Sequence, residues 1–216
     1  MSPQALKASK GEETRAQILD AAVQQASKGG FESITIGSLA ERTGLSKSGL
    51  FAHFGSRTDL QIAALDEAAR RFTQAVFLPA MKLPRGLPRL RAIFQGWIDW
   101  PEHGRLRGCP MQGASAEFDD LPGPMRDAVV ERQLQLAGEL AKAVTMAAES
   151  GELCADTDAK QFVFEMTGIV LACYSTQRLL GDARSSSRAL VAFERLVQDH
   201  LAPAAKRDSR PAAPRR

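Results

Sequence analysis

Apolar residues recur along the chain at the three- and four-residue spacing of amphipathic helices, and no two segments alternate as paired strands would. Glycines and prolines interrupt this pattern between the apolar stretches, where helices are expected to end. The sequence therefore predicts an all-α fold, with helices over residues 12–29, 36–43, 47–54, 57–72, 87–100, 109–118, 125–150, 157–180 and 187–201.

Side chains that can cap helices mark several of these boundaries. Thr35, Ser46 and Ser56 precede the second, third and fourth helices, each with an oxygen that can accept a hydrogen bond from the first turn. Gly44 and Leu45 complete a tight turn before Ser46, in which we expect the glycine to be left-handed and the leucine to be buried.

Later boundaries follow from the same reasoning. The three prolines between residues 79 and 88 are expected to interrupt regular structure. Pro101 is expected to end the helix before it, so that residues 101–108 form a loop. Asp156 or Thr157 can cap the helix over residues 157–180.

Composition excludes several classes of protein. The chain has 216 residues, of which 44% are hydrophobic and 25% charged, as in ordinary globular proteins. Its longest uninterrupted apolar run, residues 169–174, is far shorter than the ~18 residues of a membrane span. The start contains no apolar signal segment, and three widely spaced cysteines do not suggest a disulfide framework. We therefore expect a cytoplasmic protein with no membrane partner.

The net charge of +3 says little about partners, because it arises at one end of the chain. Residues 203–216 contain five basic residues and one acid, a net +4, which leaves −1 for residues 1–202. That tail either attracts phosphate nonspecifically or only aids solubility. An argument for nucleic-acid binding must therefore rest on a local pattern.

The local pattern lies in residues 35–57, where a three-residue turn with glycine joins two short predicted helices in a helix-turn-helix. Residues 42–58 contain no acid, although the chain has 25. Small or polar side chains line one side of the second helix, and such side chains let a helix backbone approach the floor of the DNA major groove. These residues are Ser46, Lys47, Ser48, Gly49, Ala52 and His53.

Residues spread over positions 12–62 carry a family resemblance. They are Thr14-Arg15, Ile18-Leu19-Asp20-Ala21-Ala22, Gly30-Phe31, Thr35, Leu39-Ala40, Gly44-Leu45-Ser46, Leu50-Phe51, His53-Phe54, Ser56-Arg57 and Leu60. This stretch resembles the N-terminal domain of TetR-family transcriptional repressors. The resemblance implies a homodimer with a three-helix DNA-binding head and a helical body that binds a small-molecule effector.

The same resemblance implies how the chain is divided. We expect a flexible arm over residues 1–10, a helix-turn-helix DNA-binding domain over 11–71, an effector-binding and dimerisation domain over 72–202, and a basic disordered tail over 203–216. The dimer interface is expected in the last two helices, residues 157–180 and 187–201, whose broad apolar surface agrees with that role.

Individual roles in DNA binding also follow from the resemblance. Thr35 and Ser46 would cap helices and touch phosphates. His53 would reach a phosphate, and Arg57 stands where the family usually has lysine. The residues expected to face base edges or nearby phosphates are Lys47, Ser48 and Gly49.

Phe51 departs from the family pattern. The family often has tyrosine at this position, whose hydroxyl can bond a phosphate. Phenylalanine keeps the ring and loses that bond, so we expect Phe51 to act through packing or van der Waals contact, at a loss of about 1 kcal/mol.

The body offers candidates for an effector site. The candidate lining residues are apolar and would suit a lipophilic or aromatic ligand, although they equally fit an ordinary core. They are Phe94, Trp97, Cys109, Met111, Phe118, Phe162 and Met166, with Trp100 nearby in sequence. No metal site is expected, because His53, His103 and His200 are scattered, and no cofactor motif is present.

Cys109 supports an alternative mechanism. The run Gly108-Cys109-Pro110-Met111, with Glu117 beyond it, resembles a segment in a TetR subgroup, some members of which respond to electrophiles or oxidants. Arg105 and Arg107 precede Cys109, and a helix start there would lower a thiol pKa. Two hypotheses for Cys109 therefore remain: it is the sensor of a redox- or electrophile-responsive regulator, or it is a buried structural cysteine. Cys154 and Cys173 are expected to be inert.

Other functions remain as competing hypotheses. Cys109 with His103, or Ser115 with Glu117, could suggest an enzyme, but neither pair has an orienting third group or a recognisable motif. A helical adaptor that binds a protein partner without DNA is the second rival. Activation also remains possible in place of repression, because DNA-contact geometry does not fix the sign of regulation.

Overall fold

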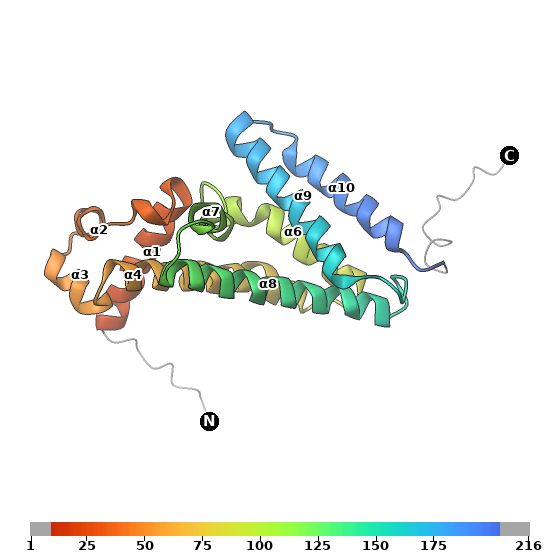
Figure 1. The fold of residues 1–216 in the computed structure, drawn as a ribbon, viewed down its shortest axis with the longest axis horizontal. Helices are drawn as coiled ribbons and strands as arrows, with labels where there is room; N and C mark the ends of the chain where they lie inside the picture. Colours follow the sequence, from red (N-terminus) through yellow and green to blue (C-terminus); the bar gives the residue numbers. More distant parts are fainter. Residues whose placement is uncertain (1–9, 204–216) are drawn as a thin grey trace, which may run out of the picture. The chain divides into compact units, whose positions relative to one another are not determined.

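A computed structural model describes residues 10–203, and these residues form an all-α fold, as predicted (Figure 1). The elements are α1 (Lys10–Gly29), η1 (Phe31–Ser33), α2 (Ile36–Thr43), α3 (Lys47–Phe54), α4 (Arg57–Phe72), η2 (Thr73–Phe77), α5 (Leu78–Ala80), α6 (Leu87–His103), α7 (Pro110–Phe118), α8 (Pro124–Glu149), α9 (Ala159–Leu180) and α10 (Ser185–His200). Lys10, placed in the arm by the sequence, belongs to α1, and the rest of the arm and residues 204–216 of the tail lie outside the described residues.

The chain divides into two compact units. Unit 1 contains the residues up to Arg70 together with Leu106–Val130, and unit 2 contains Arg71–Arg105 together with the residues from Glu131 onward. The division falls inside α4 and inside α8. Unit 1 therefore combines the helix-turn-helix with α7, a helix that lies far from it in the sequence.

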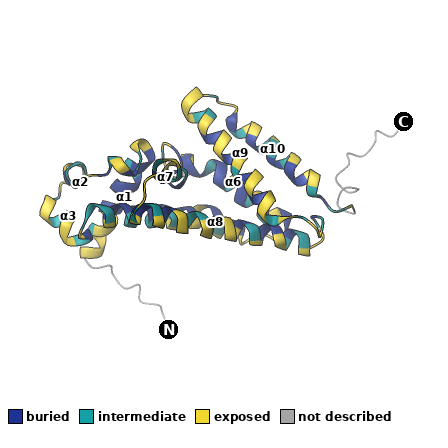
Figure 2. Cartoon of the chain, in the orientation of Figure 1, coloured by how far each residue is buried: buried dark blue, intermediate teal, exposed yellow. Residues whose placement is uncertain are grey.

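The core of unit 1 is formed by the inner faces of its short helices. Apolar residues of every helix from α1 to α4, and of the connection between α1 and α2, are fully buried (Figure 2). They are Ile18, Ala22, Val23, Phe31, Ile34, Leu39, Leu50, Leu60, Ala64 and Ala68. Their three-four spacing is the pattern from which the sequence predicted these helices.

The core of unit 2 is aromatic. Phe94 of α6 stacks on Phe193 of α10 with ring centroids 4.0 Å apart, and Phe162 of α9 meets Phe193 edge-on. Phe72 lies edge-to-face against both Trp97 and Trp100, at centroid distances of 5.8 and 5.7 Å. The helices α9 and α10 pack side by side along their lengths (Figure 1).

Pro101 does not end its helix, contrary to the sequence prediction, because α6 continues to His103. A proline inside a helix leaves the carbonyl four residues earlier without its usual N–H donor, here the carbonyl of Trp97. The buried hydroxyl of Tyr174, on α9, donates to that carbonyl instead. The loop is consequently shorter than predicted and covers residues 104–109.

Two further boundaries, and the burial of one residue, differ from the predictions. Asp158, and neither of its two predecessors, caps α9, with Oδ1 accepting from the N–H groups of Lys160 and Gln161. Residues 73–80 remain helical through a π-helical turn and α5, so the proline-rich interruption begins at residue 81. Leu45 is half-buried rather than buried.

Among the described residues, none of the helices has the length and apolar character that a membrane crossing requires.

Candidate nucleic-acid interface

The helix-turn-helix begins with a complete capping box. The N–H of Ser38 donates to Thr35 Oγ1 at 3.1 Å, and the N–H of Thr35 donates to Ser38 Oγ at 3.2 Å. Two N–H groups that α2 would leave unpaired are thereby satisfied. Gly44 then ends α2 in the left-handed conformation, with φ of 71°, which costs glycine little. Thr35 and Gly44 have the local structural roles that the sequence predicted.

The next helix, α3, is anchored on one face and open on the other. Ser46 caps it by accepting from the N–H of Gly49 at 3.1 Å, and Leu50 and Phe54 are buried beneath it. The opposite face is exposed, as Figure 2 shows, and carries Lys47 and Ser48. This face combines one cation with small side chains, and the acid-free run over residues 42–58 adds no carboxylate to it.

Phe51 lies on the exposed face, with 47% of its surface accessible. Its ring is therefore accessible to a partner, and the predicted packing or van der Waals contact stays a prediction. His53 is half-buried in the last turn of α3, with its ring 6.3 Å from that of Phe54.

Arg57 has an internal contact that the sequence did not predict. Its Nε donates to the carbonyl of Ile34 at 2.8 Å, and Nη2 pairs with the carboxylate of Glu32 at 3.2 Å. These bonds fasten the start of α4 to the connection between α1 and α2. The side chain is still 42% exposed, so a phosphate contact through its free edge stays a prediction.

Sequence reasoning missed two residues that hold this surface together. The guanidinium of Arg15 lies 5.0 Å from the ring centroid of Phe54, which places a cation beside α3. Gln61 is buried and donates to the carbonyl of Phe31 at 2.8 Å. The spacing of Gln61 to Ala64 and Ala68 places Gln61 on the buried stripe of α4, and this spacing could have identified it. Nothing in the sequence pairs Arg15 with Phe54.

Comparisons with known proteins agree with this geometry. Residues 18–64 match the family model described as bacterial regulatory proteins, tetR family. Residues 86–193, half of the chain, match the model described as tetracyclin repressor-like, C-terminal domain. The chain belongs to the TetR family. It is therefore a DNA-binding transcriptional regulator whose helix-turn-helix is followed by a helical C-terminal domain.

Relatives of this TetR-family regulator include the HTH-type transcriptional activator FasR of Mycolicibacterium smegmatis. FasR is 29% identical over 92 residues, which are 43% of this chain and 42% of FasR. A TetR regulator from Chloroflexus aurantiacus J-10-FL shares the fold with a TM-score of 0.81, at 21% identity over 89% of this chain and 98% of that one. AibR, solved with isovaleryl coenzyme A and operator DNA, has a TM-score of 0.67, at 20% identity over 88% of this chain and 99% of that one.

The predicted effector residues of this regulator are all buried, and they lie in both compact units. Unit 2 contains Phe94, Trp97, Phe162 and Met166, and unit 1 contains Cys109, Met111 and Phe118. The four in unit 2 lie on α6 and α9, and two of them, Phe94 and Phe162, share contacts with Phe193. The three in unit 1 lie on α7 or at its start.

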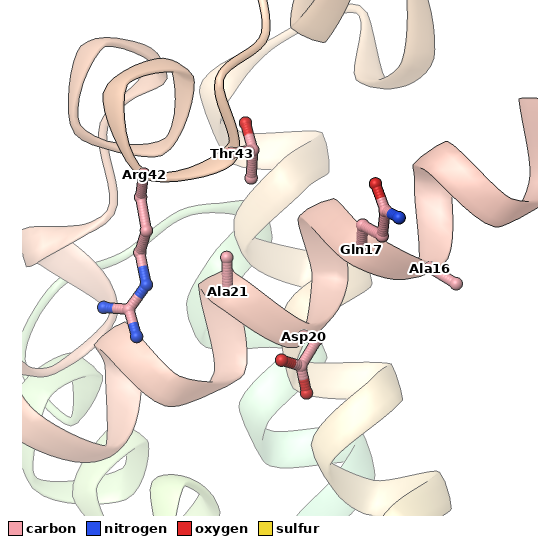
Figure 3. Close-up of a pocket in the computed structure, with 6 residues that line it drawn as sticks. All are labelled: Ala16, Gln17, Asp20, Ala21, Arg42 and Thr43. Carbon is pink, nitrogen blue, oxygen red and sulfur yellow. The ribbon is translucent and has the colours of Figure 1, made fainter.

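A hollow of about 540 Å³ opens between α1 and α2 in unit 1 (Figure 3). Ala16, Gln17, Asp20 and Ala21 line it from α1, and Arg42 and Thr43 line it from α2. The lining is small or polar, and no predicted effector residue contributes to it. The hollow therefore lacks the apolar walls expected for a lipophilic effector.

The cysteines of the regulator are free thiols. Cys109 is buried just before α7, with 4% of its surface exposed, which leaves an electrophile little access to its sulfur. Burial raises the pKa of the Cys173 thiol, and a hydrogen bond with Ser186 offsets part of that rise. A raised pKa leaves less reactive thiolate, in line with the expectation that Cys173 is inert.

Among the described residues, no group of histidines, cysteines and acids could hold a metal ion.

Proposed function

We propose that this regulator binds a near-palindromic operator as a homodimer, with α3 of each copy in a major groove, and represses transcription until an effector releases it. The observation that carries the proposal is the exposed, acid-free face of α3 on a firmly capped helix-turn-helix. A two-fold dimer would place two such helices one turn of DNA apart, about 34–36 Å.

The proposed DNA contacts fall into two classes. Phosphate contacts set affinity and register, and base contacts set sequence preference. We assign the phosphate class to Thr35, Ser46, His53 and Arg57. Lys47, Ser48 and Gly49 of α3 would meet base edges or nearby phosphates, and Phe51 would add packing or van der Waals contact.

A second copy of the chain is the proposed dimer partner. Phe164, Leu171 and Leu179 are exposed on one stripe of α9, and Val191 is exposed on α10. Fully burying one such side chain contributes about 1.5–3 kcal/mol. In a two-fold dimer the same surface of each copy contacts the other, so the stripes of both copies would be buried.

The proposed effector site lies in the aromatic core of unit 2. The indole N–H groups of Trp97 and Trp100 are buried and have no hydrogen-bond acceptor among the described residues. An unpaired buried donor costs about 1–3 kcal/mol, which an acceptor on a ligand would recover. We infer an apolar effector that carries a carbonyl or similar oxygen. AibR, of the same fold, was solved in complex with isovaleryl coenzyme A and operator DNA, and the isovaleryl group of that ligand joins an apolar chain to a carbonyl.

The proposed effector can be tested by fluorescence, because Trp97 and Trp100 are the only tryptophans of the chain. We expect 2-nonanone to change their emission and to bind more tightly than nonane, which lacks the carbonyl. Trp97→Phe and Trp100→Phe should reduce that preference. Equal binding of the two probes would exclude the indoles as donors to an effector.

Activation is a second candidate function, favoured by the name of FasR, a transcriptional activator that matches part of this chain. Repression and activation need the same DNA contacts, so they differ only in whether binding lowers or raises transcription. Transcript levels of the adjacent genes should rise when the regulator is deleted if it represses, and fall if it activates.

The DNA-binding proposal is tested by fluorescence anisotropy with labelled duplexes from the DNA that flanks its gene. We expect saturable binding to one near-palindromic duplex that survives an excess of unrelated DNA and weakens as salt increases. Lys47→Ala should reduce the preference for that duplex. No salt-sensitive binding to any flanking duplex would contradict the proposal.

A further inference from the structure

A carboxylate from α7 holds the connection between α1 and α2. The N–H of Phe31 donates to Glu117 Oε2 at 2.7 Å, and the N–H of Glu32 donates to Oε1 at 2.6 Å. Hydrogen bonds to an ionised acceptor are about twice as strong as neutral ones. The preceding residue, Gly30, has φ of 79°, and a Cβ there would lie 2.7 Å from the carboxylate oxygens. Glycine thus permits this close approach.

The other side of the same connection is held by α4. Gln61 donates to the carbonyl of Phe31, and Arg57 donates to the carbonyl of Ile34, each at 2.8 Å. The segment that leads into α2 is therefore fixed by α7 through its N–H groups and by α4 through its carbonyls. Because α2 begins at Ile36, these bonds fix the direction in which α2, and α3 after it, leave α1.

The position of α7 in the chain makes this contact significant. The C-terminal family model covers residues 86–193 and so includes α7, yet α7 belongs to unit 1. The segments that flank it directly, Arg71–Arg105 and the residues from Glu131 onward, belong to unit 2. The N–H of Arg107 also donates to the buried Ser27 Oγ, at 3.3 Å, which ties the chain just before α7 to α1.

We propose that Glu117 is a positioning residue for DNA binding: its carboxylate orders the α1–α2 connection and so fixes the direction in which α2 and α3 leave α1. This inference rests on the proposed DNA contacts of α3. Without the carboxylate, two N–H groups lose their acceptor and the connection loosens. DNA binding must then order it again, which lowers affinity.

The test compares Glu117→Gln with Asp120→Asn. Glutamine offers one acceptor oxygen, and its amide group would face the second N–H as another donor. Asp120 is exposed three residues further along, so its variant removes the same charge from the same segment. Loss of a negative charge alone should strengthen binding to polyanionic DNA in both variants. We expect E117Q to bind operator about tenfold more weakly than the wild type, and D120N to bind as well or slightly better.

The temperature of the measurement and two further readouts separate positioning from a general loss of stability. Measured well below the unfolding temperature, a variant that is only less stable stays folded and keeps its affinity. The salt dependence of E117Q binding should be unchanged, because no proposed phosphate contact is removed. Hydrogen exchange should quicken in residues 31–54 and not in α9 or α10.

Equal affinity of E117Q and D120N, or exchange that quickens throughout the chain, would overturn the role of Glu117. A wild-type protein that binds no flanking DNA would instead overturn the proposed function. In that case the exchange of residues 31–54 still decides whether Glu117 orders the connection.

Discussion

At the scale of single residues, the cations of unit 1 differ in what they already contact. Lys47 lies exposed on α3, whereas Arg57 bonds the carbonyl of Ile34 and pairs with Glu32. Arg57 can therefore influence DNA binding both by contacting a phosphate and by fixing the segment that leads into α2. These two routes respond differently to salt, because only a phosphate contact releases a counterion.

We predict that Arg57→Ala weakens binding to all duplexes and reduces the slope of log K against log salt by about one. Arg57→Lys should keep the slope and lower affinity less, because lysine keeps the charge and loses the forked bonds to the protein. Anisotropy titrations at several salt concentrations measure both quantities. If Arg57→Ala shows the same slope of log K against log salt as the wild type, Arg57 does not contact a phosphate.

At the scale of elements, capping and proline chemistry decide where helices begin and end. The N-caps Thr35, Ser46 and Ser56 of α2, α3 and α4 were correctly predicted, because each accepts from an N–H three residues later. The end of α6 was wrongly predicted, because the donor that replaces the missing N–H of Pro101 is Tyr174, far away in the sequence. The sequence therefore predicted a helix boundary correctly only where the hydrogen-bond partner at that boundary is a near neighbour in the chain.

This arrangement predicts a non-additive pair of substitutions in α6 and α9. Tyr174→Phe should lower the free energy of unfolding by about 1–3 kcal/mol, because the buried carbonyl of Trp97 loses its donor. Pro101→Ala supplies an N–H to the same carbonyl, so the double variant should recover most of that loss. Urea unfolding of the four proteins measures the cycle. Additive effects would show that the two donors do not share the carbonyl.

At the scale of the whole molecule, the proposed function depends on a second copy of the chain. The exposed stripe of α9 is the surface that the proposed dimer would cover, and Leu179 is its most exposed residue at 81%. Leu134, on α8, is also an exposed leucine at 69% and lies on another helix. The two leucines therefore form a matched pair.

We predict that Leu179→Asp yields a monomer that loses tight operator binding, whereas Leu134→Asp changes neither property. A charge buried in an apolar interface is desolvated without a partner and opposes association. Light scattering coupled to size exclusion measures the mass of each variant. A dimeric Leu179→Asp protein would place the interface away from this stripe.

The sequence by itself determined the helices of the DNA-binding head, their caps and the family. Those features depend on apolar spacing and on hydrogen bonds between near neighbours, which the order of residues records directly. The tertiary structure alone decided that Glu117 bonds Phe31 and Glu32, that Arg15 lies over Phe54, and that α7 belongs with the head. Such contacts join residues that are distant along the chain, and their partners become known only when the packing of the helices brings them together.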